Sequence, residues 1–230
     1  MPDFSGFPEE MIKFFGQLEK NNNKEWFDRH REEYEAYVKG PSIEFVIAMG
    51  DKLRSLSPGI KAIPKVNQSL FRINRDTRFS HDKRPYKTNT GIWFWEGVRK
   101  RMECSGFYFH LGGGKLMLAS GMHIFSKENL KRYRDAVIDK KKVRKLSKIT
   151  KELVEQGYTL SEEHYKKIPR GYEIAPEYEG FLLYNGMAAM IEMDIPKEFY
   201  TSAIVEYAFS HFKNMKPLHG WLVESIAIGP

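Results

Sequence analysis

The stretch that most restricts the fold is a hairpin signal near the middle of the chain. Residues 107–111 read Phe-Tyr-Phe-His-Leu, residues 112–114 are three glycines, and residues 115–118 read Lys-Leu-Met-Leu. Two apolar runs around a glycine turn predict two antiparallel strands, because glycine readily adopts the positive φ angles of tight hairpin turns. Apolar side chains would fall on both faces of this hairpin, so we expect the sheet to be covered on both sides.

The chain before the hairpin shows helical periodicity. The first 57 residues predict three helices. The first begins near Glu9, and the second follows the asparagines at 21–23, since asparagine is a good N-cap. We expect the second helix to stop at Gly40-Pro41 and the third to end at Pro58-Gly59.

Further strands are expected on both sides of the hairpin. Residues 66–73 alternate in hydrophobicity, and residues 91–95 read Gly-Ile-Trp-Phe-Trp. A second hairpin is predicted around Asn185-Gly186, with strands at 181–184 and 187–192, because this dipeptide favours a two-residue turn.

Helices are also predicted in the second half of the chain. One begins at Ser126, and residues 140–153 form an amphipathic helix with a cationic face. That face is a second surface for a polyanion or simply a solvated helix side. Two more helices are expected at 197–214 and 216–227.

This order of elements predicts an α+β fold: N-terminal helices packed on a mainly antiparallel sheet, with further C-terminal helices. The sequence shows no repeat and no low-complexity linker. We therefore expect a single domain over residues 1–230. A separate helical subdomain over residues 1–57 stays open.

Positive charge is concentrated in residues 71–88, which read FRINRDTRFSHDKRPYKT. The cations are Arg72, Arg75, Arg78, Lys83, Arg84 and Lys87, and the acids are Asp76 and Asp82. Arginine matches phosphate or carboxylate with two parallel hydrogen bonds, and two acids cannot neutralise six cations. We expect a strand leading into an anchored loop that binds an anionic ligand, either nucleic acid or a phosphorylated metabolite.

Other residues extend this predicted site. Tyr86 and Trp93 are expected to stack on a base or sugar, although core packing is the alternative for Trp93. Arg170, in the turn Pro169-Arg170-Gly171, adds one more cation.

Two alternatives remain for the same segment. In an enzyme acting on a phosphorylated or carboxylated small molecule, the candidate proton carriers are Asp76, Asp82 and His81. In a purely structural motif, the charges form ion pairs that fasten the helices to the sheet. The sequence leaves open whether the protein is an enzyme, which ligand it binds and what its oligomeric state is.

Composition restricts the partners only loosely. The net charge of +7 permits a polyanion without requiring one. No cofactor, metal or membrane partner is expected, since no histidine pair has helical metal-ligand spacing and no apolar run reaches membrane-spanning length. Cys104 is the single cysteine, which indicates a cytoplasmic location. No G-x-S-x-G motif occurs, and nothing favours a Ser-His-Asp arrangement.

Residues 71–91, together with Pro169–Glu173, resemble the domain of unknown function 2461 family. Its signature is close to F-R-x-x-R-D-x-R-F-S-x-D-K-x-P-Y-K-T, and every fixed position is present between Phe71 and Thr88. The similarity extends over nearly the whole chain, but the His-Pro pair that many members carry after PRGY is replaced by Ile174-Ala175-Pro176. The resemblance implies a single α+β domain and supplies no activity.

Overall fold

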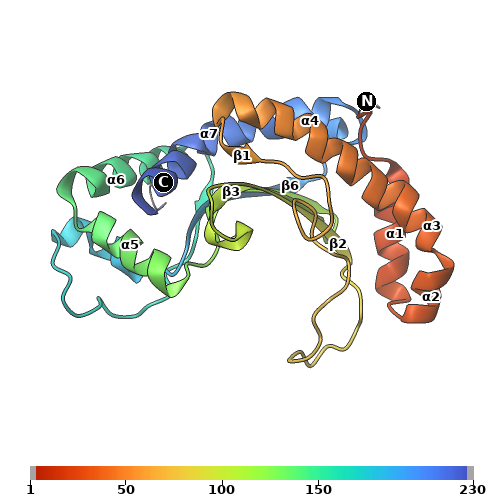
Figure 1. The fold of residues 1–230 in the computed structure, drawn as a ribbon, viewed down its shortest axis with the longest axis horizontal. Helices are drawn as coiled ribbons and strands as arrows, with labels where there is room; N and C mark the ends of the chain where they lie inside the picture. The colour runs from red at the N-terminus through yellow and green to blue at the C-terminus, as the bar shows by residue number, and fades with distance from the viewer. Residues whose placement is uncertain (1–3, 227–230) are drawn as a thin grey trace. The chain divides into compact units, whose positions relative to one another are not determined.

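The computed structural model describes residues 4–226, in which seven α-helices accompany a six-stranded antiparallel sheet (Figure 1). The helices are α1 (Glu9–Lys20), α2 (Lys24–Arg29), α3 (Arg31–Glu33), α4 (Gly40–Leu56), α5 (Lys127–Val137), α6 (Lys140–Glu155) and α7 (Ala203–Ile226). The strands are β1 (Ile60–Lys61), β2 (Asn89–Glu96), β3 (Ser105–Gly112), β4 (Lys115–Met122), β5 (Thr159–Leu160) and β6 (Met187–Asp194), in the spatial order β1-β2-β3-β4-β6-β5. The predicted α+β class with an antiparallel sheet is confirmed.

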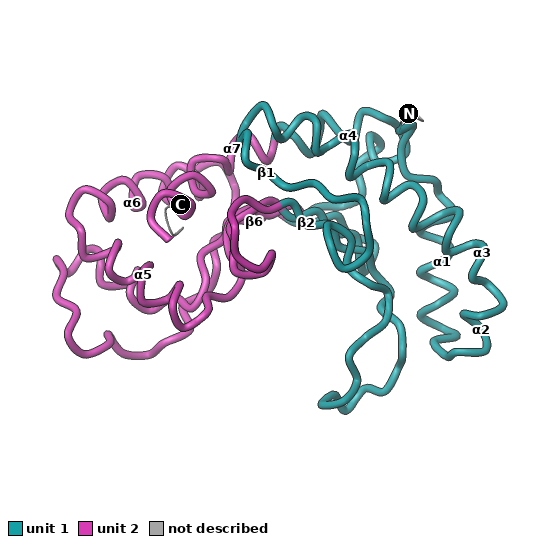
Figure 2. Tube along the Cα trace, viewed as in Figure 1, with its two compact units in different colours: residues 1–94, 108–117, 192–210 teal, residues 95–107, 118–191, 211–230 magenta. Residues whose placement is uncertain are grey.

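The chain divides into two compact units (Figure 2). Unit 1 holds residues up to 94, 108–117 and 192–210. Unit 2 holds residues 95–107, 118–191 and those from 211 onward. The single domain over 1–230 and the subdomain over 1–57 stay predictions.

The N-terminal helices begin where the sequence predicts. α1 buries Met11, Phe14, Phe15 and Leu18 along one side. Asn23 caps α2, since its side-chain oxygen accepts a hydrogen bond from the Trp26 backbone N–H at 2.9 Å. Both starts follow from local chemistry: apolar spacing for α1 and an N-cap for α2.

The helical run does not stop at Gly40-Pro41, so that prediction is wrong. A π-helical segment, Tyr34–Lys39, leads directly into α4, whose first two residues are Gly40 and Pro41. The Gly40 N–H still donates to the Glu35 carbonyl of the π-helical segment, and the fixed φ angle of proline is itself compatible with a helix, so the run continues through Pro41. The predicted end of α4 before Pro58-Gly59 is confirmed.

The central hairpin is confirmed as β3 and β4. Its turn residues Gly113 and Gly114 have φ angles of 59° and 74°. Two successive positive φ angles are the requirement of the turn that matches strand twist, which explains why glycines stand there.

The core of unit 1 is aromatic. On β3, Phe109 stacks on Phe7 with ring centroids 5.6 Å apart and lies 4.5 Å from Phe45 of α4. The alternate residues Tyr108 and His110 are only partly buried. The expectation that both faces of the hairpin are covered holds at its far end, where residues 105–107 and 118–122 are all buried. It fails near the turn, where β3 alternates between a buried aromatic face and a partly open polar one.

Two predicted strands are absent. Residues 66–73, all of them described, form only isolated bridges around Leu70, and the turn through Asn67 has a φ of 64°. Residues 181–184 lie largely in a 3-10 helix, Pro176–Leu183, so the hairpin at Asn185-Gly186 does not form. β6 pairs instead with β5, with Thr159 opposite Met190.

The helices α5 and α6 of unit 2 bury the apolar sides that the sequence predicts. Ser126 caps α5, and α6 buries an apolar stripe that includes Val143, Leu146 and Leu153. α7 is one helix that continues through Pro217, so the predicted division into two helices is wrong; position 227 lies outside the described residues. Across residues 4–226, no helix has the length and apolar character needed to cross a membrane.

Candidate anion-binding site

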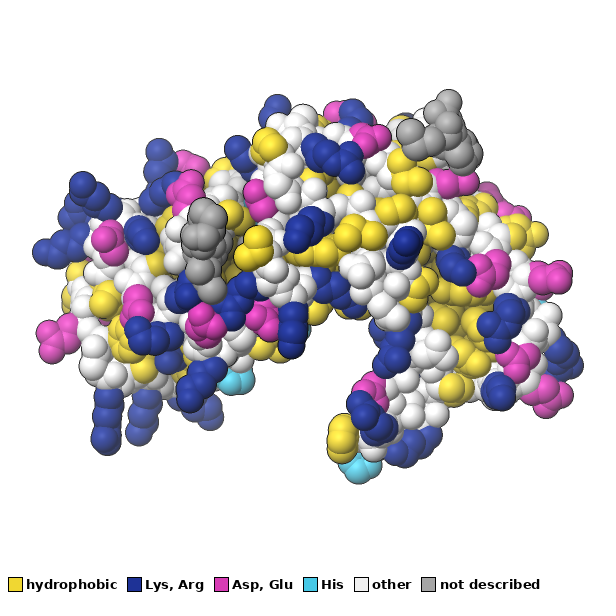
Figure 3. All heavy atoms as spheres, in the orientation of Figure 1, with side chains coloured by type: hydrophobic (Ala, Val, Ile, Leu, Met, Phe, Trp, Pro, Cys, Tyr) yellow, Lys and Arg dark blue, Asp and Glu magenta, His cyan; other side chains and the backbone are white. Residues whose placement is uncertain are grey.

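Residues 71–88 form an extended loop that closes at its base. Asn74 and Tyr86 make an isolated antiparallel bridge. The Arg75 N–H donates to the Pro85 carbonyl and the Lys87 N–H to the Ile73 carbonyl, both at 2.8 Å. The predicted anchored loop agrees with this geometry, but the predicted strand before it is absent. In Figures 1 and 3 the loop projects away from the sheet, and lysine and arginine side chains gather on it.

The N-terminal helical segment of the chain anchors this loop through residues at and near α2. The Asn22 side chain donates to the Tyr86 carbonyl at 2.9 Å and accepts from the Tyr86 N–H at 3.0 Å. The Tyr86 ring stacks on Phe27 with centroids 4.1 Å apart and is 7% exposed. Tyr86 therefore works as an anchor, and its covered ring is poorly placed to stack on a ligand. Trp93 is similarly buried, at 8% exposure.

Three arginines of the loop are held by the two acids. Arg78 donates two hydrogen bonds to Asp76, from Nε to Oδ1 at 3.0 Å and from Nη2 to Oδ2 at 2.8 Å. Arg84 and Arg75 share Asp82, whose Oδ2 lies 2.8 Å from Arg84 Nη2 and 2.5 Å from Arg75 Nη1. These bonds fix the directions in which the guanidinium groups point.

The same pairs keep the carboxyl groups ionised. Hydrogen bonds from Arg78 lower the pKa of Asp76 to about 2, and hydrogen bonds from Arg84 and then Arg75 lower the pKa of Asp82. Such carboxylates accept protons weakly near neutral pH, so the geometry gives no support to Asp76 or Asp82 as a general base. His81 is exposed.

The other three cations of the loop are placed differently. Arg72 is exposed, and its charge helps to lower the pKa of Asp76. Lys83 donates to the neutral carbonyl of Thr77 at 3.0 Å, and the Lys87 ammonium lies 5.5 Å from the centre of the Phe71 ring. Six cations less two acids leave a formal charge of +4 on the segment, His81 counted as neutral. Because the paired guanidinium groups of Arg78 and Arg84 are themselves largely exposed, the geometry does not favour a purely structural ion-pair motif.

A pocket of about 370 Å³ adjoins the base of the loop. Its walls combine loop and strand residues: Phe71, Arg75, Asp76, Lys87, Asn89, Gly91 and Tyr108. The sequence did not single out Asn89, Gly91 or Tyr108 as site residues. The only available signal was the alternation of β2 and β3, which puts these residues on the face opposite to the aromatic core.

Gly91 makes room for the far wall of the pocket. A Cβ at this position would lie 2.4 Å from the Tyr108 hydroxyl, so only glycine lets the Tyr108 ring lie across β2. The Tyr108 hydroxyl in turn hydrogen-bonds with His110 Nδ1 at 3.1 Å. Burial raises the pKa of Tyr108 to about 12 and lowers the pKa of His110, so the pair is neutral near pH 7.

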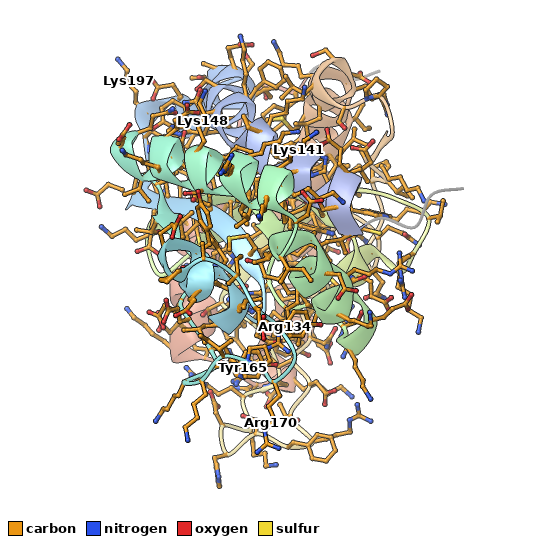
Figure 4. The ribbon with its side chains drawn as sticks, turned by 90° about the vertical axis from the view of Figure 1, so that its left-hand side faces the viewer. Arg134, Lys141, Lys148, Tyr165, Arg170 and Lys197 are labelled. Atoms are coloured by element: carbon orange, nitrogen blue, oxygen red, sulfur yellow. The ribbon has the colours of Figure 1, made fainter. Side chains whose placement is uncertain are left out.

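The remaining predicted cations belong to unit 2. Arg170 is exposed in its turn, where Gly171 has the expected positive φ, 83°. Figure 4 shows Lys141 and Lys148 on α6 and Arg134 beside Tyr165, whose ring centre is 4.8 Å from the guanidinium carbon. Lys145 pairs with Glu224 at 2.8 Å and Lys148 with Glu152 at 3.8 Å, so the basic face of α6 is partly neutralised.

In the described part of the chain, no three histidine, cysteine, aspartate or glutamate side chains gather closely enough to hold a metal ion. The fold and this site define an α+β protein with a cationic loop over a partly open strand face. The chain belongs to the family described as "Conserved hypothetical protein (DUF2461)", whose model matches residues 10–221. Comparisons with curated proteins and with solved structures found no match. The family resemblance seen in the sequence is thus confirmed, and it assigns no activity.

Proposed function

We propose that this protein binds an anionic, phosphate-bearing ligand at the loop 71–88 and the pocket at its base. The observation that carries this proposal is the unbalanced charge beside the pocket. Arg75 and Lys87 line the pocket together with one carboxylate, Asp76, and the exposed Arg72 is near enough to Asp76 to help lower its pKa. A phosphate supplies the negative charge that the loop lacks.

The paired arginines also contribute. A guanidinium group has five N–H donors, and the fork to a carboxylate occupies two of them. Arg78 and Arg84 therefore retain donors for phosphate oxygens while Asp76 and Asp82 hold them in position. Preorganised side chains lose less conformational entropy on binding, which favours affinity. Lys83 remains in the proposed set as an exposed cation of the loop, and Arg170 stays a separate prediction within unit 2.

Nucleic acid is the first ligand class to test. The protein is titrated into fluorescently labelled single-stranded and double-stranded oligonucleotides at several salt concentrations, and anisotropy is measured. We expect binding that weakens steeply with salt, because phosphate contacts release counterions. Inorganic phosphate and nucleoside triphosphates serve as competitors that report a small-anion site.

The double variant Arg72→Ala/Lys87→Ala tests the assignment of residues. We expect at least tenfold weaker binding, and the slope of the salt dependence should fall by about one unit for each phosphate group that the variant no longer binds. Arg29→Ala is the matched control, since Arg29 is an exposed arginine of α2 that pairs with Glu25 at 3.4 Å. Equal affinity of the double variant and the control would contradict the assignment.

A cytoplasmic location belongs to the same proposal. Cys104 cannot form an internal disulfide, which suits a reducing compartment where nucleic acid and phosphorylated metabolites are found.

A further inference from the structure

Unit 2 contains a buried chain of hydrogen bonds between a serine, a histidine and a glutamate. Ser105 Oγ lies 2.9 Å from His219 Nδ1, and His219 Nε2 lies 2.9 Å from Glu96 Oε2. His219 is 1% exposed and Ser105 is 4% exposed. Ser105 begins β3, Glu96 ends β2 and His219 lies in α7, so these residues assemble only on folding.

The chemistry of the three groups fixes the direction of the hydrogen bonds. An ionised carboxylate only accepts hydrogen bonds, so Glu96 accepts one from the N–H at His219 Nε2. The Nδ1 atom of a neutral imidazole then carries the lone pair and accepts the Ser105 hydroxyl proton. This is the relation that activates a serine: a base on its hydroxyl and a third group that orients the base. The serine meets Nδ1 here, whereas in the chymotrypsin-type arrangement it meets Nε2.

An apolar pocket of about 210 Å³ opens beside this chain of hydrogen bonds. Ser105 and Glu96 are part of its lining. Most of the other lining side chains are apolar: Val98, Cys104, Met122, Leu222, Val223 and Ile226. A nucleophile at the wall of a small apolar pocket suits a short hydrocarbon group carrying an electrophilic carbon.

The same pocket contains an unused donor. Arg99 also lines it, and its Nη1 atom is buried without a hydrogen-bond partner among the described residues. The other guanidinium nitrogens are held by Glu103, at 3.1 Å from Nε, and by Glu128, at 2.5 Å from Nη2. A buried donor without a partner is costly. A ligand oxygen that bears or develops negative charge would satisfy it.

We propose that Ser105 is a nucleophile for the hydrolysis of carboxylic esters with a short apolar acyl group. Ser105 Oγ bonds to the ester carbonyl carbon while His219 Nδ1 takes the hydroxyl proton, and Arg99 Nη1 stabilises the carbonyl oxygen as it becomes negative. The carbon–alkoxide bond then breaks, and the alcohol leaves with the proton from His219. Water attacks the acyl-serine in the same way, so that ester and water become acid and alcohol. Glu96 is a positioning residue.

A small alkyl fluorophosphonate is the probe, applied to the full-length protein. Ser105 Oγ displaces fluoride at phosphorus, and the protein gains the mass of one phosphonyl group. We expect one equivalent of adduct by intact-mass spectrometry, mapped to Ser105 by peptide analysis. Hydrolysis of p-nitrophenyl acetate and butyrate is measured in parallel and should be blocked by the adduct.

Variants separate a nucleophile from a buried structural serine. Ser105→Ala should remove both labelling and hydrolysis, while Ser120→Ala is the matched control. Ser120 is another buried serine of unit 2, whose hydroxyl donates to the Gly106 carbonyl at 3.0 Å. His219→Gln should slow labelling by about 10²- to 10⁴-fold, the usual contribution of a general base.

The role of Glu96 has a spectroscopic readout. Nitrogen-15 NMR of the unmodified protein should show the proton of neutral His219 on Nε2, and Glu96→Ala should weaken this preference and slow labelling. A proton on Nδ1 would overturn the proposal, because that nitrogen could not accept from Ser105. So would an adduct on another residue, or a folded wild-type protein that neither reacts with the probe nor hydrolyses either ester. The wild-type experiments do not depend on the folding of any variant.

Discussion

At the scale of single residues, Asn22 is the clearest case of one side chain that fixes the cationic loop 71–88. Its amide makes two hydrogen bonds with the backbone of Tyr86, in the way that a neighbouring strand would. These bonds add to the antiparallel bridge between Asn74 and Tyr86 at the base of the loop. They hold Tyr86 against Phe27 and so set where the cationic loop begins.

Asn22→Ala should therefore destabilise the protein. We expect the free energy of unfolding to fall by about 1–3 kcal/mol, because two hydrogen bonds are lost and the backbone groups of Tyr86 are left partly buried. Urea denaturation measures the change. Asn21→Ala is the control, since the Asn21 side chain makes one exposed bond to the Gln17 carbonyl and its loss should change the value by less than about 0.5 kcal/mol. Equal effects of the two variants would contradict the anchoring role.

The lowered pKa values of Asp76 and Asp82 predict how the stability of the protein depends on pH. A carboxyl group whose folded pKa lies below its unfolded value stabilises the protein above the unfolded pKa, and this contribution is lost as pH falls through the folded pKa. For Asp76 the loss runs from about pH 4 to about pH 2. NMR titration of the side-chain carboxyl should give a pKa near 2 in the wild type and a value closer to 4 in Arg78→Ala. Arg84→Ala should instead raise the pKa of Asp82 and leave that of Asp76 in place.

At the scale of elements, the sequence predicts those parts of the fold whose signals are local. The stripe of α6 and the caps of α2 and α5 depend on residues within one or two helical turns. The errors fall where tertiary packing outweighs a local signal. α7 continues through Pro217, and the Asn185-Gly186 turn signal is overridden because β6 pairs with β5.

The candidate site divides in the same way. The cationic loop is visible in the sequence because its charges lie close together along the chain, and its ion pairs join residues at most seven positions apart. The sequence did not predict the part of the pocket wall formed by Tyr108. It also did not predict the contact between Ser105 and His219, because these two residues are 114 positions apart. Only the fold brings such side chains together.

Substituting glycines tests whether backbone conformation controls stability at a given position. Alanine at two of them should change the free energy of unfolding in opposite directions. Gly16→Ala in α1 should stabilise the protein by about 0.5–1 kcal/mol, because alanine favours a helix and a Cβ there meets no atom within 4 Å. Gly171→Ala also meets no atom within 4 Å, but its φ is 83°, so alanine should destabilise by about 1–2 kcal/mol. Denaturation midpoints measure both. Changes of the same sign would show that backbone conformation does not control these positions.

At the scale of the whole molecule, the two units are not separate stretches of chain. The chain passes between them five times, and each passage falls inside a regular element: β2, β3, β4, β6 and α7. A domain boundary usually lies in an exposed linker that few contacts cross. Unfolding one unit alone would disrupt these five elements part-way along their length.

We therefore expect one cooperative unfolding transition. In scanning calorimetry, the ratio of calorimetric to van't Hoff enthalpy should lie close to one. Leu18→Ala in unit 1 and Leu146→Ala in unit 2 provide a matched pair, since both leucines are fully buried and each substitution should cost about 2–5 kcal/mol. Each variant should shift the same single transition to lower temperature. Two transitions, each lowered by only one of the variants, would instead show that the units unfold independently and that residues 1–230 are not a single domain.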